Sequence, residues 1–322
     1  MIVLKVSAII PTLGRRRELE TVLRRLDGIR LHEVLVVANG LDPRPLEELV
    51  STSLHASRLL STTKNVGIAA RNLAAREATG ELLLMLDDDS YPLPGALEAL
   101  VEAFAGRPRL GAAAGRVREV DEDGSILAES GVGTFDWFFR GGRDGPAGSE
   151  GQPTFFFPEG ASLLRREAFL EVGGFFEPFV FHCEGLELAT RLLARRWDVR
   201  YVPEARFDHL RHGSRAFDAS SLDHRVRNQV WYFWLHFPAP LVARRVPAYL
   251  AFDLVECAYR RVPGAWVRGV VGAWRGRSAV RGRRRPLPRE VVRRAELNRG
   301  RLHAKLLVHQ LKRRVRRGTT SA

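Results

Sequence analysis

The chain has few cysteines and no long apolar segment. Its 322 residues include two cysteines, Cys183 and Cys257, too few for a disulfide framework. The first six residues lack the pattern of a secretory signal. No uncharged apolar run approaches the ~20 residues that span a bilayer. We therefore expect a cytoplasmic protein in a reducing setting, without membrane-spanning helices.

Acidic residues are scarce in the last third of the chain. Residues 211–322 carry 26 Lys/Arg against 6 Asp/Glu, a balance of +20, whereas residues 1–210 carry 25 against 31, a balance of −6. The net charge of +14 therefore arises from the C-terminal third. This split predicts a domain boundary near residue 215, with domains at 1–215 and 216–322.

Short apolar runs alternate with amphipathic stretches over the first 210 residues. The predicted strands lie at 6–10, 34–37, 58–60, 82–86, 112–117, 160–164 and 198–202. The predicted helices lie at 16–27, 43–52, 68–79, 94–105, 166–172 and 184–196. Repeated strand–helix units of this length indicate an α/β fold with a Rossmann-like, mostly parallel sheet that helices cover on both faces.

Three consecutive carboxylates, Asp87, Asp88 and Asp89, directly follow the apolar run 82–86. In open α/β sheets, ligands bind at the carboxyl ends of the strands. Adjacent carboxylates repel one another unless a cation lies between them, and hard oxygen ligands suit Mg²⁺ or Mn²⁺. The triplet therefore predicts a divalent metal site. The alternative is a solvated acidic turn.

Five sequence blocks resemble, in the right order, those of family 2 glycosyltransferases. The blocks are residues 7–12 with 36–40, 65–72, 84–89, 159–166 with 172–175, and 184–191 with 202–209. The resemblance covers about residues 5–215. It implies a GT-A fold and an inverting transfer of a sugar from a nucleotide-diphosphate donor. The acceptor would be a hydroxyl group of a glycan, a lipid-linked or a small molecule, as in the synthesis of cell-envelope polysaccharides.

The resemblance also implies a donor site at the carboxyl ends of the first strands. It places the nucleotide sugar against Pro11, Thr12, Asn39, Asn65, Gly67, Arg71, Asp87 and Asp88. A guanidinium at Arg71 can pair with a diphosphate or stack on a base. Any one of the strand-end residues could equally be a plain turn residue.

For the metal, the resemblance implies Asp89 and His209 as ligands. Neutral imidazole is a common metal ligand, and His212 is a rival to His209. A divalent cation would neutralise the diphosphate as the nucleoside diphosphate leaves.

The general base is less clear, because the sequence departs from the family pattern. Many relatives have Glu-Asp at the start of the helix near 184, and the Asp acts as the base. Here the pair is Glu184-Gly185. Either Glu184 takes this role, which we favour, or Glu187 reaches in from nearly one turn later. The alternative for Glu187 is a salt bridge to Arg191 at i+4.

The sequence says less about which donor and which acceptor are used. Ala38 stands where many relatives carry an Asp that binds uracil, which weakens the case for UDP and leaves dTDP- or GDP-sugars open. On the acceptor side the resemblance implies Gly160 and Ala161. Trp137 lies in the Gly- and aromatic-rich segment 130–154, which is either a disordered insert or a loop that orders over a ligand.

The basic C-terminal third, from residue 222, alternates aromatic stretches with arginines. Tryptophan and phenylalanine beside arginine clusters suit helices that lie in a membrane interface, with the basic runs on anionic lipid. We expect a peripheral protein on the inner face of the plasma membrane. Nucleic-acid binding is the main rival but is not expected, and a merely solvated tail is the third reading.

Two other function classes remain open. A sugar nucleotidyltransferase would share the strand-end carboxylates, but it would need a Gly-rich basic loop after the first strand, and residues 11–15 match that loop poorly. A nucleic-acid-binding protein would need no acidic triplet.

Overall fold

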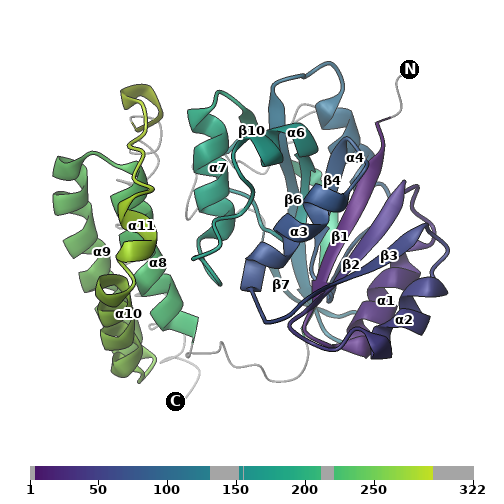
Figure 1. Cartoon of the computed structure of the whole chain (residues 1–322), viewed down its shortest axis with the longest axis horizontal. Helices are drawn as coiled ribbons and strands as arrows, with labels where there is room; N and C mark the ends of the chain where they lie inside the picture. The colour runs from purple at the N-terminus through teal and green to yellow at the C-terminus, as the bar shows by residue number, and fades with distance from the viewer. Residues whose placement is uncertain (1–3, 131–151, 155, 212–220, 293–322) are drawn as a thin grey trace, which may run out of the picture.

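The computed structural model describes residues 4–130, 152–154, 156–211 and 221–292. A single mixed sheet forms its centre, with the strand order β3-β2-β1-β4-β9-β6-β10-β5. The short strands β7 and β8 pair with β6 and β10 respectively. Helices lie on both faces of this sheet, and further helices lie beside α7 (Figure 1).

The predicted strands are all present. They are β1 (Val6–Thr12), β2 (Glu33–Asn39), β3 (Ser57–Thr62), β4 (Leu82–Leu86), β6 (Leu110–Val120), β9 (Ala161–Arg165) and β10 (Asp198–Leu210). The three additional strands are β5 (Ser90–Pro92), β7 (Ile126–Ser130) and β8 (Gln152–Pro153). The helices of the first 210 residues are α1 (Arg16–Leu26), α2 (Arg44–Ser51), η1 (Gly67–Ala69), α3 (Ala70–Glu77), α4 (Ala96–Phe104), α6 (Arg166–Glu171) and α7 (Glu184–Ala194).

Four neighbouring strands of the sheet run parallel. β1 pairs in parallel with β2 and β4, and β2 pairs in parallel with β3. β9 runs antiparallel between β4 and β6, and β10 is parallel to β6. β2 and β4 are buried along their whole length, which explains the unbroken apolar runs 34–38 and 82–86.

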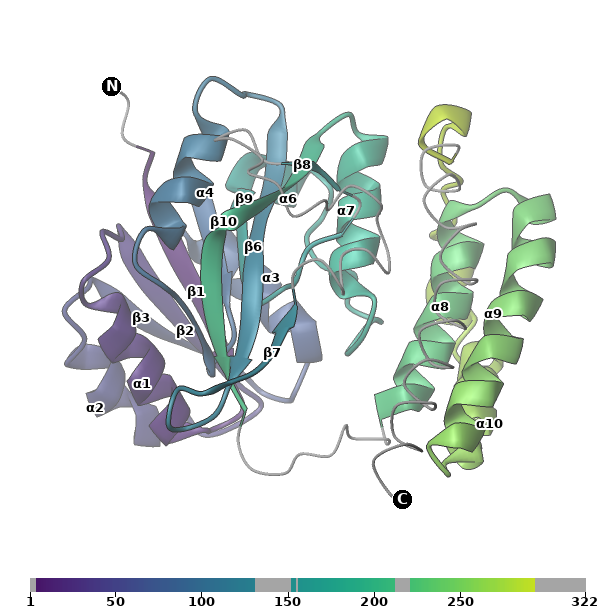
Figure 2. The same ribbon diagram turned by 180° about the vertical axis from the view of Figure 1, so that it is seen from behind.

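Each face of the sheet buries its own set of helices. Ile10 and Val36 pack with α1, α2 and α4, whereas their neighbours Ile9 and Val37 pack with α3, α6 and α7. The alternation follows from the two-residue period of a strand. Figure 2 shows the same two helical layers from behind. The predicted α/β fold with a doubly covered, mostly parallel sheet is confirmed.

β10 is longer than the predicted strand 198–202. It continues to Leu210, and an irregular register between Tyr201 and Arg206 accommodates Pro203. Its second half pairs antiparallel with β5, which places His209 opposite Ser90. This unpredicted pairing brings the end of β10 against the acidic triplet.

The C-terminal helices form a layer beside α7 (Figures 1 and 2). They are α8 (Leu222–His236), α9 (Ala239–Tyr259), α10 (Pro263–Arg275) and α11 (Ser278–Arg281). Trp231 and Tyr232 of α8 join Leu186 of α7 in one apolar cluster. Among the described residues, no helix is both long and apolar enough to cross a membrane. The predicted boundary near residue 215 falls outside the described residues and stays a prediction.

Candidate functional site

The acidic triplet lies at the carboxyl end of β4. β1 and β2 run parallel to each other and end nearby, at Thr12 and Asn39, with the half-buried Pro11 just before Thr12. The strand-end residues predicted from the sequence therefore share one edge of the sheet. This is the edge at which open α/β sheets bind ligands.

Asp88 holds the loop that follows β1. Its side chain is buried, and its Oδ2 accepts a hydrogen bond of 2.6 Å from Thr12 Oγ1. Its Oδ1 pairs with the Arg15 guanidinium. Burial raises the pKa of Asp88, while Arg15 and Thr12 act against that rise. These contacts leave Asp88 facing the protein, so its predicted contact with the nucleotide sugar would run through Thr12 and Arg15.

Arg15 is a member of the site that the sequence did not single out. Its guanidinium also pairs with Asp89, so one cation faces two of the three carboxylates. The residue is partly exposed, at 30% of its side chain. A basic residue shortly after β1 was visible in the sequence, but nothing local showed that it would turn back toward residues 88 and 89.

Arg71 is positioned to orient Asp87. It lies in the first turn of α3, as predicted, and its Nη2 donates to Leu86 O at 2.9 Å and to Asp87 Oδ1 at 2.5 Å. The Arg71 side chain is buried, whereas the Asp87 side chain is 41% exposed. Asp87 is therefore the most exposed carboxylate of the triplet.

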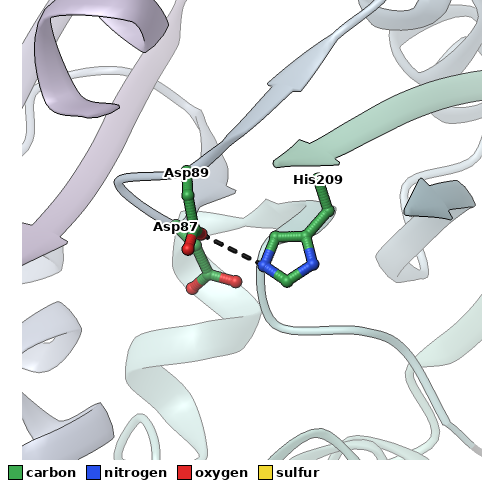
Figure 3. A group of neighbouring side chains, drawn as sticks. All are labelled: Asp87, Asp89 and His209. Carbon is green, nitrogen blue, oxygen red and sulfur yellow. Dashed lines mark ion pairs between the residues drawn. The ribbon is translucent and has the colours of Figure 1, made fainter. Parts of the chain in front are cut away.

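Asp89 and His209 face each other at the same place. His209 Nε2 lies 3.1 Å from Asp89 Oδ1, and Leu210 N donates to Asp89 O at 2.8 Å. Burial alone would raise the pKa of Asp89, but His209 and Arg15 lower it. Burial alone would lower the pKa of His209, but Asp89 raises it. Figure 3 shows Asp87, Asp89 and His209 converging on one space.

These three side chains suit a divalent cation. Their ligand atoms, two carboxylate oxygens and one imidazole nitrogen, all lie within 4.8 Å of one another. Asp89 Oδ1 is buried, and within the described residues no donor is aligned to give it a hydrogen bond. Oxygen and imidazole ligands suit Mg²⁺ and Mn²⁺ as well as other first-row metals. The predicted ligands Asp89 and His209 are thus brought together, and Asp87 joins them.

Asn39, Asn65 and Gly67 form a loop network at the end of β2. Asn39 Nδ2 donates to Asn65 Oδ1 at 3.1 Å and to Gly67 O at 3.2 Å. Gly67 N donates to Asn65 Oδ1 at 2.8 Å. Gly67 has a φ of +59°, and a Cβ there would meet Val180 O at 2.6 Å. These contacts fix the loop at the end of β2, at the sheet edge where the donor site is predicted.

The two candidate bases on α7 have different surroundings. Glu187 is buried and accepts hydrogen bonds from Arg191 Nε at 2.7 Å and Nη2 at 2.5 Å, and His236 Nε2 lies 3.1 Å away. The salt bridge that the sequence offers as the alternative role of Glu187 is therefore formed. Burial raises the pKa of Glu184 well above its ordinary value, and the nearby charge of Glu159 raises it further.

The acceptor-side residues lie beside the triplet where the structure describes them. Ala161 pairs with Leu86 across β9 and β4. A Cβ on Gly160 would overlap Asp87 Oδ2, so the glycine allows the chain to pass close to that carboxylate. Trp137 and the rival ligand His212 lie outside the described residues.

The comparisons with known proteins agree with this arrangement. A family model described as glycosyl transferase family 2 matches residues 7–173, which is more than half of the chain. The chain belongs to this family. The match includes β1, β2, the acidic triplet and β9, and it ends before α7 and His209.

Among curated relatives of this family 2 glycosyltransferase is the O-antigen biosynthesis protein RfbC of Myxococcus xanthus. It is 28% identical over 288 residues, which are 80% of this chain and 21% of RfbC. The N-acetylglucosaminyl-diphospho-decaprenol L-rhamnosyltransferase of Mycobacterium tuberculosis is 29% identical over 195 residues, 51% of this chain and 62% of the relative. The chain thus spans about a fifth of the length of RfbC and about three-fifths of the length of the rhamnosyltransferase.

A solved structure shares the fold. The mannosyltransferase PcManGT from Pyrobaculum calidifontis, solved in complex with GDP-Man and Mn²⁺, superposes with a TM-score of 0.54 at 18% identity. The match covers 85% of this chain and 76% of that one. It confirms the GT-A fold that the sequence blocks implied.

Proposed function

We propose that this protein is a divalent-metal-dependent, inverting glycosyltransferase. It would move a hexosyl or deoxyhexosyl group from a nucleotide-diphosphate sugar to a hydroxyl group of a lipid-linked or glycan acceptor. One observation carries the proposal: in a chain of family 2, Asp87, Asp89 and His209 converge at the carboxyl edge of the parallel strands.

The residues of this edge divide the work of binding the donor. Asp87, Asp89 and His209 would hold a Mn²⁺ or Mg²⁺ ion, and such an ion neutralises the charge that develops on a leaving diphosphate. Arg71 fixes the orientation of Asp87, and Arg15 holds Asp89. The chain's own guanidinium groups thereby hold both carboxylates, which face the same space (Figure 3).

The nucleotide is proposed to be dTDP or GDP. Ala38 is fully buried near the end of β2, on the face covered by α1 and α2, so this position offers no carboxylate to a uracil ring. The rhamnosyltransferase and the mannosyltransferase named above favour a deoxyhexose or mannose as the sugar. The name of the rhamnosyltransferase, with its diphospho-decaprenol, favours a lipid-linked acceptor in cell-envelope polysaccharide synthesis.

A ligand screen with a variant tests this proposal. We expect dTDP or GDP to raise the melting temperature of the full-length protein with Mn²⁺ and much less without it. Asp89→Ala should weaken nucleotide binding in Mn²⁺ by at least about tenfold, because even groups behind metal ligands change affinity by ~10–100-fold. Asp27→Ala, an exposed carboxylate just after α1, is the control and should bind as the native protein does.

Two other results would contradict the proposal. If a nucleoside triphosphate and a sugar phosphate stabilise the protein better than any nucleoside diphosphate, the chain is a sugar nucleotidyltransferase. If no nucleotide stabilises it with or without Mn²⁺, the metal and donor assignments both fail.

We also propose that the C-terminal helices attach the enzyme to an anionic membrane surface. Val267, Val271 and Trp274 follow one another at i, i+4 and i+7 on α10 and are exposed. The Arg277 guanidinium lies 4.2 Å from the centre of the Trp274 ring. Exposed apolar side chains next to arginines suit the boundary between lipid headgroups and acyl chains.

A further inference from the structure

Gly185 has no side chain, and the carboxylate of Glu159 lies in the space beside its Cα. A Cβ on Gly185 would overlap Phe157 O and would lie 2.7 Å from Glu159 Oε1. The Gly185 N–H donates a hydrogen bond to that same oxygen. The segment that precedes β9 therefore requires glycine at position 185 and places its own carboxylate at the start of α7.

The backbone around Glu159 is fixed against the acidic triplet. Gly160 lies so close to Asp87 Oδ2 that a Cβ would overlap it. Ser90 Oγ donates to Gly160 O at 2.7 Å and accepts from Asp87 N at 2.9 Å. Glu159 thus lies between the candidate metal site and the N-terminus of α7, and it is half-buried, not sealed in the core.

Three charged groups act on Glu159, each from a different element. They are Asp87 after β4, Arg71 on α3 and Glu184 on α7. Burial and the charge of Asp87 raise the pKa of Glu159 above its ordinary value, although the backbone N–H groups of Gly185 and of Glu159 itself act against that rise. The N–H groups in the first turn of a helix have no acceptor within the helix, so they also favour a negative charge nearby.

Glu184 is in the opposite situation. It is buried, and Glu159 is the strongest of the charges that act on it, so its pKa lies well above the ordinary value. Two neighbouring carboxyl groups cannot both ionise easily, and burial together with the charge of Glu159 favours the protonated form of Glu184. A protonated carboxyl group cannot accept a proton from a substrate, which weakens the case for Glu184 as the base.

We propose that Glu159, and not Glu184, is the general base of the transfer that the proposed function assigns to this site. The Glu159 carboxylate takes the proton of the acceptor hydroxyl as the acceptor oxygen bonds to the anomeric carbon of the donor. The bond between that carbon and the diphosphate oxygen breaks, and the nucleoside diphosphate leaves with the electron pair. Glu184 is a neighbouring positioning residue, and its carboxyl group stays protonated.

The test uses the full-length protein with Mn²⁺. Release of nucleoside diphosphate is measured from dTDP-rhamnose and GDP-mannose, with water and with an N-acetylglucosaminyl diphospholipid as acceptors. Glu159→Gln keeps an acceptor for the Gly185 N–H and removes the charge. We expect it to lower kcat by about 10²–10⁴-fold, the usual contribution of a general base. The affinity for nucleoside diphosphate with Mn²⁺ should stay within about threefold.

Two further variants separate a base from a structural residue. Glu159→Ala should be inactive and should recover part of its turnover with added sodium formate, which supplies a carboxylate to the vacated space. Glu102→Gln, an exposed carboxylate on α4, should match the native enzyme.

Each other outcome has a defined meaning. Near-native turnover by Glu159→Gln overturns the assignment, and so does a loss of nucleotide affinity that parallels the loss of kcat. If formate does not restore turnover in Glu159→Ala, Glu159 is only a positioning residue, and the assignment of Glu159 as the base is overturned. If the native enzyme itself releases no nucleoside diphosphate from any donor, the proposed function fails, which is a different result from an active Glu159 variant.

Discussion

At the scale of single residues, Glu187 shows how a buried carboxylate can be structural. Arg191 and His236 surround it, and they lower its pKa to about 2 although burial alone would raise it. Because His236 belongs to α8, this cluster joins α7 to the C-terminal helices. Its chemistry is that of an ion pair that holds two elements together.

We predict that Glu187→Gln lowers the free energy of unfolding by about 3 kcal/mol at pH 7, because it leaves the half-buried Arg191 guanidinium without its carboxylate partner. The folded pKa, about 2, lies below the ordinary value of 4.5. The carboxylate therefore stabilises the fold fully above about pH 5, and this contribution is lost as the pH falls toward 2. Urea unfolding at pH 7 and pH 3 measures it, with Glu102→Gln as the control. An equal penalty at both pH values would contradict the prediction.

At the scale of elements, glycines decide how closely α10 approaches α8. A Cβ on Gly269 would lie 2.6 Å from Val226 Cβ and 2.7 Å from Asp223 O. On Gly272, one turn later in the same helix, a Cβ would meet nothing closer than Arg227 Cδ at 3.5 Å. The two positions share a helix and differ in the space that they have.

This difference predicts opposite effects of one substitution. Gly272→Ala should raise the free energy of unfolding by up to about 1 kcal/mol, because alanine favours helices over glycine. Gly269→Ala should lower it by about 1–3 kcal/mol, because the added methyl group forces α8 and α10 apart. Thermal or urea unfolding of both variants measures the contrast. Stabilisation by Gly269→Ala would show that the helices are not packed as the structure has them.

The sequence predicted those parts of the site that depend on local pattern. β4 and the triplet after it, the strand ends at Thr12 and Asn39, and the start of α7 all follow from short apolar runs and turn residues. Arg15 and Glu159 were missed because their partners are distant in sequence: Arg15 pairs with Asp89, 74 residues away. Strand pairing brings such residues together, and no local pattern encodes it. Gly185 was visible in the sequence, but nothing local showed that Glu159 would accept a hydrogen bond from its N–H.

At the scale of the whole molecule, the acidic and basic parts of the sequence lie in different parts of the fold. The sheet with its acidic edge lies on one side of α7, and α8–α10 lie on the other, in the basic third of the chain (Figure 1). Trp231 and Tyr232 are buried in the layer next to α7, whereas Trp234 and Trp274 are exposed. The aromatic residues of this region thus fall into two groups, one packed next to α7 and one exposed on the outer surface.

That outer surface leads to a prediction about membranes. We expect the full-length protein to float with vesicles that contain phosphatidylglycerol, and to do so less as salt is added, because the C-terminal charge of +20 is attracted to anionic lipid. Replacing both Val271 and Trp274 by serine should weaken binding by about tenfold or more, since each large apolar side chain contributes about 1.5–3 kcal/mol when buried. Leu54→Ser, an exposed apolar residue before β3, should leave binding unchanged. If the protein does not bind vesicles but binds duplex nucleic acid with a steep salt dependence, the basic third is a nucleic-acid-binding region. If it binds neither, the basic third is a solvated surface.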